Sequence, residues 1–121
     1  LDNNMQRLYT TFDRTETAEI MRNYLATHTS PKYIIAATDT IALGALAALQ
    51  EQHIAVPANT KIVAFDNTPA AEIVTPGLST VSFDYFALGQ WLYRRLKDLS
   101  QAEPVLTDPL LRGELVRRSS W

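Results

Sequence analysis

Short apolar runs alternate with longer amphipathic segments along this chain, and the alternation restricts its fold more than any other feature. The runs at 33–37 and 61–65 are short and rich in β-branched residues, which is typical of central strands in a parallel sheet. The segments that follow them repeat apolar residues every three or four positions, as amphipathic helices do. This pattern predicts a three-layer α/β fold with a mostly parallel sheet.

We expect the elements in the order β-α-β-α-β-α-β-α-β. The predicted strands lie at 5–11, 33–37, 61–65, 79–83 and 115–116. The predicted helices lie at 15–28, from 38 or 39 to 52 or 53, from 69 onward and at 84–100, and a polar loop is predicted at 101–109. No repeat, low-complexity segment or linker divides the 121 residues, which have room for one domain and one core.

Charge and composition exclude several classes of function. The formal net charge is −2 and the basic residues are scattered, so the chain lacks the basic surface that binds a phosphate backbone. The absence of cysteine excludes disulfides and thiolate metal sites and permits a reducing compartment, so we expect a cytoplasmic protein without a membrane span. The chain starts at Leu1 rather than Met, so we expect an upstream region to be missing.

The sequence lacks motifs of catalysis. None of the four glycines belongs to a phosphate loop or a dinucleotide-binding motif, so no cofactor is expected. His28 and His53 stand apart without metal-ligand spacing, and no serine has the context of a nucleophile elbow. We therefore expect neither a catalytic residue nor a metal site.

Two aspartates follow predicted parallel strands. Asp39 and Asp66 are candidate site residues because ligands of open α/β sheets bind at the carboxyl ends of the strands. Each also has a structural alternative, Asp39 as a helix cap and Asp66 as part of a capped turn. A third alternative is an α/β enzyme in which the two form an acid/base pair, although no nucleophile, cofactor motif or metal ligand accompanies them.

Phe12 and Arg14 stand at the carboxyl end of the first predicted strand. The ring of Phe12 offers a flat apolar face on which a sugar or a base could stack, and Arg14 could meet an anionic group of the ligand. The alternatives are that Phe12 packs beneath its loop and that Arg14 is solvated.

Three longer stretches carry a family resemblance. They are Ala-Ala-Thr-Asp-Thr-Ile-Ala-Leu-Gly-Ala at 36–45, Val-Pro-Ala-Asn-Thr-Lys-Ile-Val-Ala-Phe-Asp-Asn at 56–67 and Thr-Pro-Gly-Leu-Ser-Thr-Val at 75–81. Their succession and spacing resemble the LacI/GalR repressor family. The resemblance implies a periplasmic-binding-protein-like core of two α/β subdomains with an effector between them, preceded by a helix-turn-helix head. Residues 1–121 resemble only the C-terminal subdomain, so we expect a sheet edge or an apolar patch to be exposed.

The resemblance also implies roles for single residues. Asp66 matches an effector-contacting aspartate of the family, and Phe12 matches an aromatic residue that packs on the effector. Thr38 stands where many members have an effector-contacting asparagine, and its hydroxyl offers fewer hydrogen bonds than an amide.

Three apolar residues are similar to the family's dimer contacts. They are Leu43, Ile73 and Val74. Each could instead belong to the core. The interface is favoured, and a two-fold pair would suit a palindromic operator.

The expected function is therefore the sensing and dimerisation part of a bacterial transcription regulator. The expected partners are a sugar, sugar phosphate or purine effector, a second copy of the chain, and operator DNA only through the absent head. The alternative from another class is an exported sugar-binding protein of a transport system, which shares the fold and the cleft.

Overall fold

The computed structural model describes residues 5–98 and 112–121, which form a four-stranded sheet with helices. The elements are α1 (Arg14–Thr27), β1 (Tyr33–Ile35), α2 (Asp39–Glu51), β2 (Lys61–Phe65), α3 (Pro69–Ile73), β3 (Ser79–Ser82), α4 (Tyr85–Asp98) and β4 (Glu114–Val116). The sheet order is β1-β2-β3-β4, in which β1, β2 and β3 run parallel and β4 runs antiparallel to β3. The mostly parallel α/β architecture predicted from the sequence is thus confirmed.

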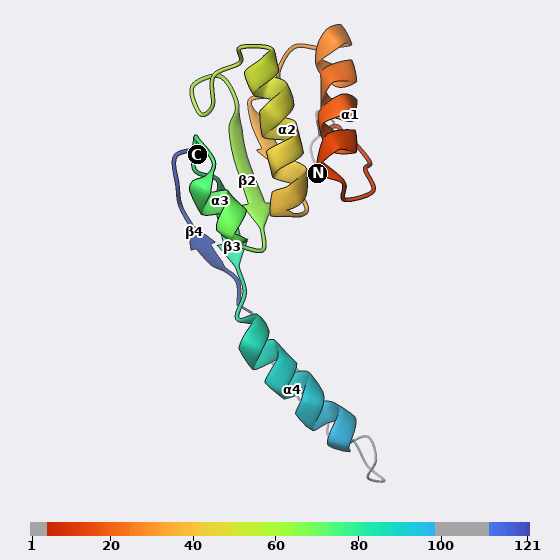
Figure 1. The fold of residues 1–121 in the computed structure, drawn as a ribbon, viewed down its shortest axis with the longest axis vertical. Helices are drawn as coiled ribbons and strands as arrows, with labels where there is room; N and C mark the ends of the chain where they lie inside the picture. The colour runs from red at the N-terminus through yellow and green to blue at the C-terminus, as the bar shows by residue number, and fades with distance from the viewer. Residues whose placement is uncertain (1–4, 99–111) are drawn as a thin grey trace.

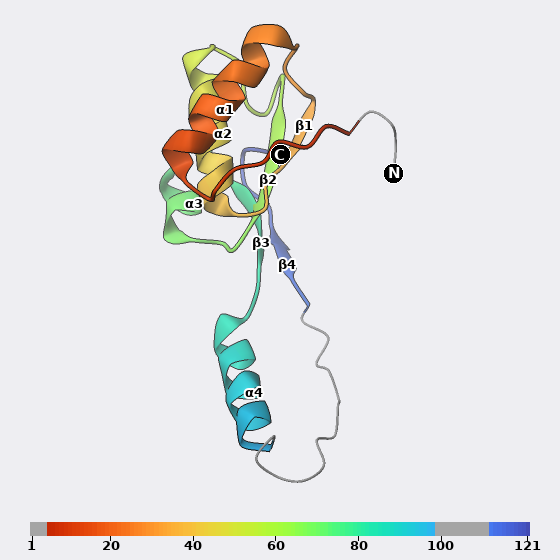
Figure 2. The same cartoon turned by 90° about the vertical axis from the view of Figure 1, so that its right-hand side faces the viewer.

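The core lies on one face of the sheet. In β2, Ile62 and Ala64 are fully buried, whereas the residues that alternate with them are only half-buried. Leu46 and Leu49 of α2 pack into the same cluster and are also inaccessible to solvent. Burial of each such leucine contributes about 1.5–3 kcal/mol to folding, so this face holds most of the hydrophobic stabilisation. Figure 2 shows α1, α2 and α3 together on this side of the sheet.

The opposite face of the sheet is open in the described part of the chain. Tyr33 and Ile35 of β1 are 61% and 72% exposed, and Leu115 of β4 is 55% exposed. The described residues do not form the expected third layer, because α4 extends away from the sheet instead of folding back onto it (Figure 1). An exposed apolar patch, by contrast, was expected and is present.

The predicted strand at 5–11 is wrong, because these residues form no strand and the last of them bond to the first turns of α1. The amide of Thr11 donates to the Glu16 carboxylate (3.0 Å), so it is not available to a sheet. The Thr11 hydroxyl also donates to this carboxylate, and together these bonds lower the pKa of Glu16. Asp13 accepts from the Glu16 amide (2.8 Å) and so is the N-cap of α1.

The other predicted elements are observed with ends shifted by a few residues. The strands predicted at 33–37 and 79–83 end at Ile35 and Ser82, and α4 begins at Tyr85. The predicted loop at 101–109 and the end of the helix predicted at 84–100 lie outside the described residues. Within the residues described, no helix is long and apolar enough to cross a membrane.

Gly44 lets α1 and α2 approach each other closely. A Cβ atom at this position would lie 2.5 Å from the carbonyl oxygen of Arg14 and 2.7 Å from Cβ of Thr17. Both are too short for a real contact, so this crossing requires glycine. The crossing holds the start of α1 beside the first turns of α2, at the end of the sheet toward which β2 points (Figure 1).

Candidate functional site

The turn after β2 has an unusual backbone that is held in place by its amides. Asp66 and Asn67 have φ values of 109° and 54°, a region that residues other than glycine seldom adopt. The Asp66 amide donates to the carbonyl of Val81 (3.0 Å), and the Asn67 amide donates to Oγ1 of Thr80 (3.2 Å). These bonds to the neighbouring strand fix the direction in which the turn presents Asp66.

The Asp66 carboxylate is half-buried and accepts a hydrogen bond from a tyrosine. The phenol of Tyr85, the first residue of α4, donates to Oδ1 of Asp66 at 2.8 Å. This bond raises the pKa of Tyr85, because loss of its proton would break the bond and set a phenolate against the carboxylate. A carboxylate that accepts a hydroxyl hydrogen bond here has the chemistry to accept one from a sugar.

An aromatic row lies beside this carboxylate. The rings of Phe65 and Phe83 stack with centroids 6.4 Å apart, and those of Phe83 and Tyr85 meet at 6.1 Å in a tilted arrangement. The row combines apolar faces with an adjacent polar group, as a site for a sugar or a base requires. Phe83 and Tyr85 were not predicted as site residues, although both follow β3 closely and so stand at the carboxyl edge of the sheet.

Phe12 and Arg14 lie near the start of α1. The side chain of Phe12 is 62% exposed and its φ is 66°, so the alternative that it packs beneath its loop is wrong. Arg14 is exposed, and its guanidinium makes no hydrogen bond or ion pair with any other described residue. No hydrogen bond or ring contact joins either residue to Asp66 within residues 5–98 and 112–121.

Thr38 and Asp39 have different roles at the start of α2. Thr38 is the N-cap, and its Oγ1 accepts from the amide of Ile41 at 3.3 Å. Its half-buried hydroxyl keeps a proton to donate. Asp39 is fully buried and its carboxylate is bonded to protein groups, so the alternative in which it contacts a ligand directly is wrong. For the same reason Asp39 cannot meet a substrate as half of an acid/base pair.

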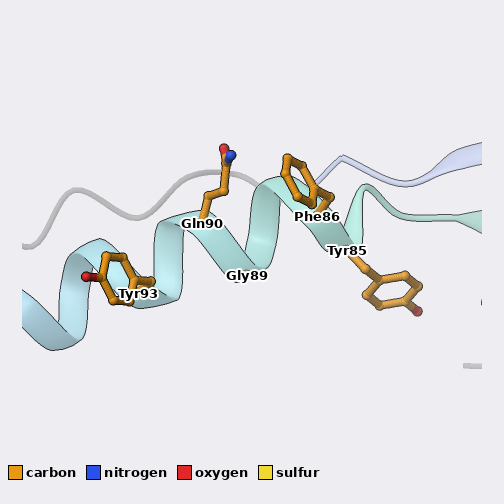
Figure 3. Close-up of a pocket in the computed structure, with 5 residues that line it drawn as sticks. All are labelled: Tyr85, Phe86, Gly89, Gln90 and Tyr93. Atoms are coloured by element: carbon orange, nitrogen blue, oxygen red, sulfur yellow. The ribbon is translucent and has the colours of Figure 1, made fainter.

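Two further features of the described residues offer no built site. Among the residues that the structure describes, no three His, Cys, Asp or Glu side chains gather into a group that could hold a metal ion. A hollow along α4 is lined by Tyr85, Phe86, Gly89, Gln90 and Tyr93 (Figure 3). One helix supplies all of these residues, and Phe86 and Gln90 rise from one side of it while Tyr85 points to the other. The hollow is therefore an open surface feature of one helix and not a cleft between elements.

The three predicted dimer contacts differ in exposure. Ile73, the last residue of α3, is 81% exposed. Leu43 on α2 is half-buried, and Val74 is half-buried and packs partly against the core. Ile73 therefore offers the most apolar surface to a partner.

The chain matches a known domain over nearly its whole length. A model of the periplasmic binding protein-like domain matches residues 2–121, so the chain belongs to this family. Its relatives are transcription regulators of the LacI type. The lactose operon repressor of Escherichia coli (strain K12) is 36% identical over 90 residues, which cover 74% of this chain and 25% of the repressor. The repressor PurR of Pasteurella multocida (strain Pm70) is 30% identical over 113 residues, which cover 90% of this chain and 33% of that protein.

Solved structures agree with this assignment. The Lac repressor bound to ONPG superposes with a TM-score of 0.83 and 30% identity, covering 91% of this chain and 34% of that one. A LacI-family regulator from Sanguibacter keddieii DSM 10542 superposes with a TM-score of 0.81 and 32% identity, covering 99% and 46%. The predicted family resemblance and fold class are therefore confirmed. The chain spans between a quarter and a third of the length of the two curated relatives.

Proposed function

We propose that this chain is the effector-sensing and dimerisation part of a cytoplasmic transcription repressor, and that residues 1–121 are the C-terminal part of its effector-binding domain. The DNA-binding head and the first subdomain then lie outside these residues. The observation that carries the proposal is the position of the Asp66 carboxylate. It lies on a turn that is fixed by hydrogen bonds at the carboxyl edge of the sheet, and it accepts a hydrogen bond from the hydroxyl of Tyr85. No catalytic step and no cofactor are part of this function.

The proposed effector is a sugar, a sugar phosphate or a purine. Asp66 would accept its hydrogen bonds, Thr38 would donate one, and Phe12 would supply a stacking face. The exposed guanidinium of Arg14 suits an anionic group. A LacI-family regulator from Arthrobacter sp. FB24, which is 28% identical with a TM-score of 0.77, was solved in complex with lactose, and this supports a sugar as the first compound to test.

The proposed assembly is a two-fold dimer that uses Leu43, Ile73 and Val74. The Lac repressor, which is 30% identical with a TM-score of 0.81, was solved as a dimer on its operator. Effector binding would change the relative placement of the two subdomains and hence the affinity of the head for DNA. Such coupling between two sites is typically about 1–3 kcal/mol.

The test is a thermal-shift screen of the intact protein against lactose, galactose, ribose, glucose 6-phosphate and hypoxanthine. A ligand that binds only the folded state raises the melting temperature. For the compound that does so, Asp66→Asn should abolish the shift and the release from operator DNA, while operator binding itself persists. Glu72→Gln, which neutralises an exposed carboxylate on α3, is the matched control and should leave both unchanged. An Asp66→Asn protein with the wild-type titration midpoint would refute the site.

A further inference from the structure

We infer that Asp39 is the positioning residue of the turn that carries Asp66, and that it acts through Thr68 and Thr80. The inference rests on the proposed function, because it concerns how the proposed effector-binding carboxylate is held. Asp39 itself would not touch the effector.

The Asp39 carboxylate binds two segments that come much later in the chain. Its Oδ2 accepts from the amide of Thr68 (2.6 Å) and from the hydroxyl of Thr68 (3.0 Å). Its Oδ1 accepts from the hydroxyl of Thr80 (2.6 Å). One side chain at the start of α2 therefore holds the end of the Asp66 turn and strand β3 together.

Thr80 extends this connection to the residue next to Asp66. Its fully buried hydroxyl donates to Asp39 and accepts from the amide of Asn67. Both backbone amides that follow Asp66 are therefore connected to the Asp39 carboxylate. The Thr68 amide donates to it directly, and the Asn67 amide donates to the Thr80 hydroxyl, which donates to it in turn.

A simple helix cap does not account for Asp39. Thr38 already caps α2 through Ile41, and the hydrogen bonds of the Asp39 carboxylate all go to residues outside its own helix. A buried carboxylate is costly unless its oxygens are satisfied, and these three hydrogen bonds satisfy both oxygens of Asp39. Within the described residues no ion pair neutralises the charge of Asp39. The three hydrogen-bond donors and the N-terminus of α2 stabilise this charge instead.

The backbone of the turn explains why such a support is needed. Asp66 and Asn67 both have left-handed φ values, which cost free energy and relax unless neighbouring groups hold them. A relaxed turn would move the Asp66 carboxylate away from Tyr85 and from an effector. Arg118 also donates to Oδ1 of Asn67 (2.8 Å), so loss of Asp39 should displace the turn without releasing it entirely.

The hydrogen bond between Tyr85 and Asp66 reports on the turn without any ligand. The ionisation of the tyrosines of the intact protein is followed by ultraviolet absorbance, and the difference between wild type and Tyr85→Phe gives the titration midpoint of Tyr85. The same measurement on Asp66→Asn protein gives the Tyr85 midpoint in the absence of the carboxylate. Asp39→Asn should move this midpoint down toward the Asp66→Asn value, in part because the charge of Asp39 itself raises the pKa of Tyr85. Thr80→Val, which keeps the shape of the side chain and removes the hydroxyl, should do the same, and Thr80→Ser should restore the wild-type midpoint. Ile62→Val, a mild core change in β2 outside this network, is the control and should have no effect.

Lactose binding provides the second measurement. Asp39→Asn and Thr80→Val should weaken it by about tenfold, while Thr80→Ser and Ile62→Val stay within about twofold of wild type. An unchanged Tyr85 midpoint in folded Thr80→Val protein, which keeps the charge of Asp39, overturns the inference, and Asp39→Asn decides if that protein does not fold. If lactose binds equally well to the Asp66→Asn protein, the proposed effector site is wrong. If lactose does not bind the wild-type protein, lactose is not the effector. In both cases the tyrosine titration still decides the role of Asp39.

Discussion

The phenol of Tyr85 donates a 2.8 Å hydrogen bond to Asp66 and so joins the first turn of α4 to the turn after β2. A carboxylate with this partner is already engaged before any effector arrives. An incoming hydroxyl must therefore either share the carboxylate or replace the phenol. Because α4 extends away from the sheet, replacement of the phenol would free the start of this helix to change direction (Figure 1).

Removal of the Tyr85 hydroxyl should strengthen effector binding. Tyr85→Phe deletes the internal competitor for Asp66 and keeps the ring next to Phe83. A net hydrogen bond is worth about 0.5–1.5 kcal/mol, so we expect the affinity to rise by about two- to tenfold. Calorimetric titration with the compound found by the thermal screen measures this. Tyr93→Phe, at another exposed tyrosine of α4, should leave the affinity unchanged, and a weaker complex with Tyr85→Phe would mean that the phenol contacts the effector instead.

The same bond should make stability depend on pH in the alkaline range. The folded protein raises the pKa of Tyr85 above its ordinary value of 10.0, chiefly through the hydrogen bond to Asp66. A raised pKa stabilises the protonated folded state, so the contribution is complete below pH 10.0 and is lost as the pH rises through the higher folded value. Urea unfolding at a series of pH values should show a steeper alkaline loss of stability for wild type than for Tyr85→Phe. If wild type and Tyr85→Phe lose stability identically as the pH rises, the hydrogen bond between Tyr85 and Asp66 does not form in solution.

Gly44 and Gly89 should respond in opposite directions to alanine. Gly44→Ala places a Cβ atom 2.5 Å from the backbone oxygen of Arg14, whereas a Cβ at Gly89 would meet nothing within 4 Å beyond its chain neighbours and the backbone of its own helix. Overpacking should lower the free energy of unfolding of Gly44→Ala by about 1–3 kcal/mol. Gly89→Ala should gain up to about 1 kcal/mol from helix propensity. Urea unfolding of the intact protein compares them, and equal effects would show that α1 and α2 do not cross at Gly44.

The parts of the fold that were predicted correctly depend on local sequence, and the errors come from distant partners. The period of apolar residues in β2 and α2 is a local property, so these elements and the position of Asp66 at a strand end were predictable. Asp39 looked like a cap or a ligand contact because Thr68 and Thr80, the residues that bind it, follow 29 and 41 positions later. Tyr85 was assigned only to a helix, since its bond to Asp66 depends on the direction of the chain after β3.

The strand predicted at 5–11 failed for a related reason. Its apolar and polar residues suit an extended segment, but a strand also needs a neighbour to accept its backbone hydrogen bonds. The described sheet ends at β1, and the Thr11 amide finds its acceptor in Glu16 of the following helix. The first helix was predictable because the spacing of its apolar residues is a local property, and the bond from the Glu16 amide to Asp13 that caps it is local too.

Ile73 should contribute most to the proposed dimer. It is 81% exposed at the end of α3, so a charge there costs the folded monomer little, whereas an interface that buries it would have to desolvate that charge. Ile73→Asp should raise the dimer dissociation constant of the intact protein by about tenfold or more, as loss of a central interface contact does. Sedimentation equilibrium measures this constant, and urea unfolding of the monomer verifies the fold. Ile73→Leu keeps an apolar side chain of similar volume and should remain dimeric. An Ile73→Asp protein that dimerises like wild type would place the interface elsewhere.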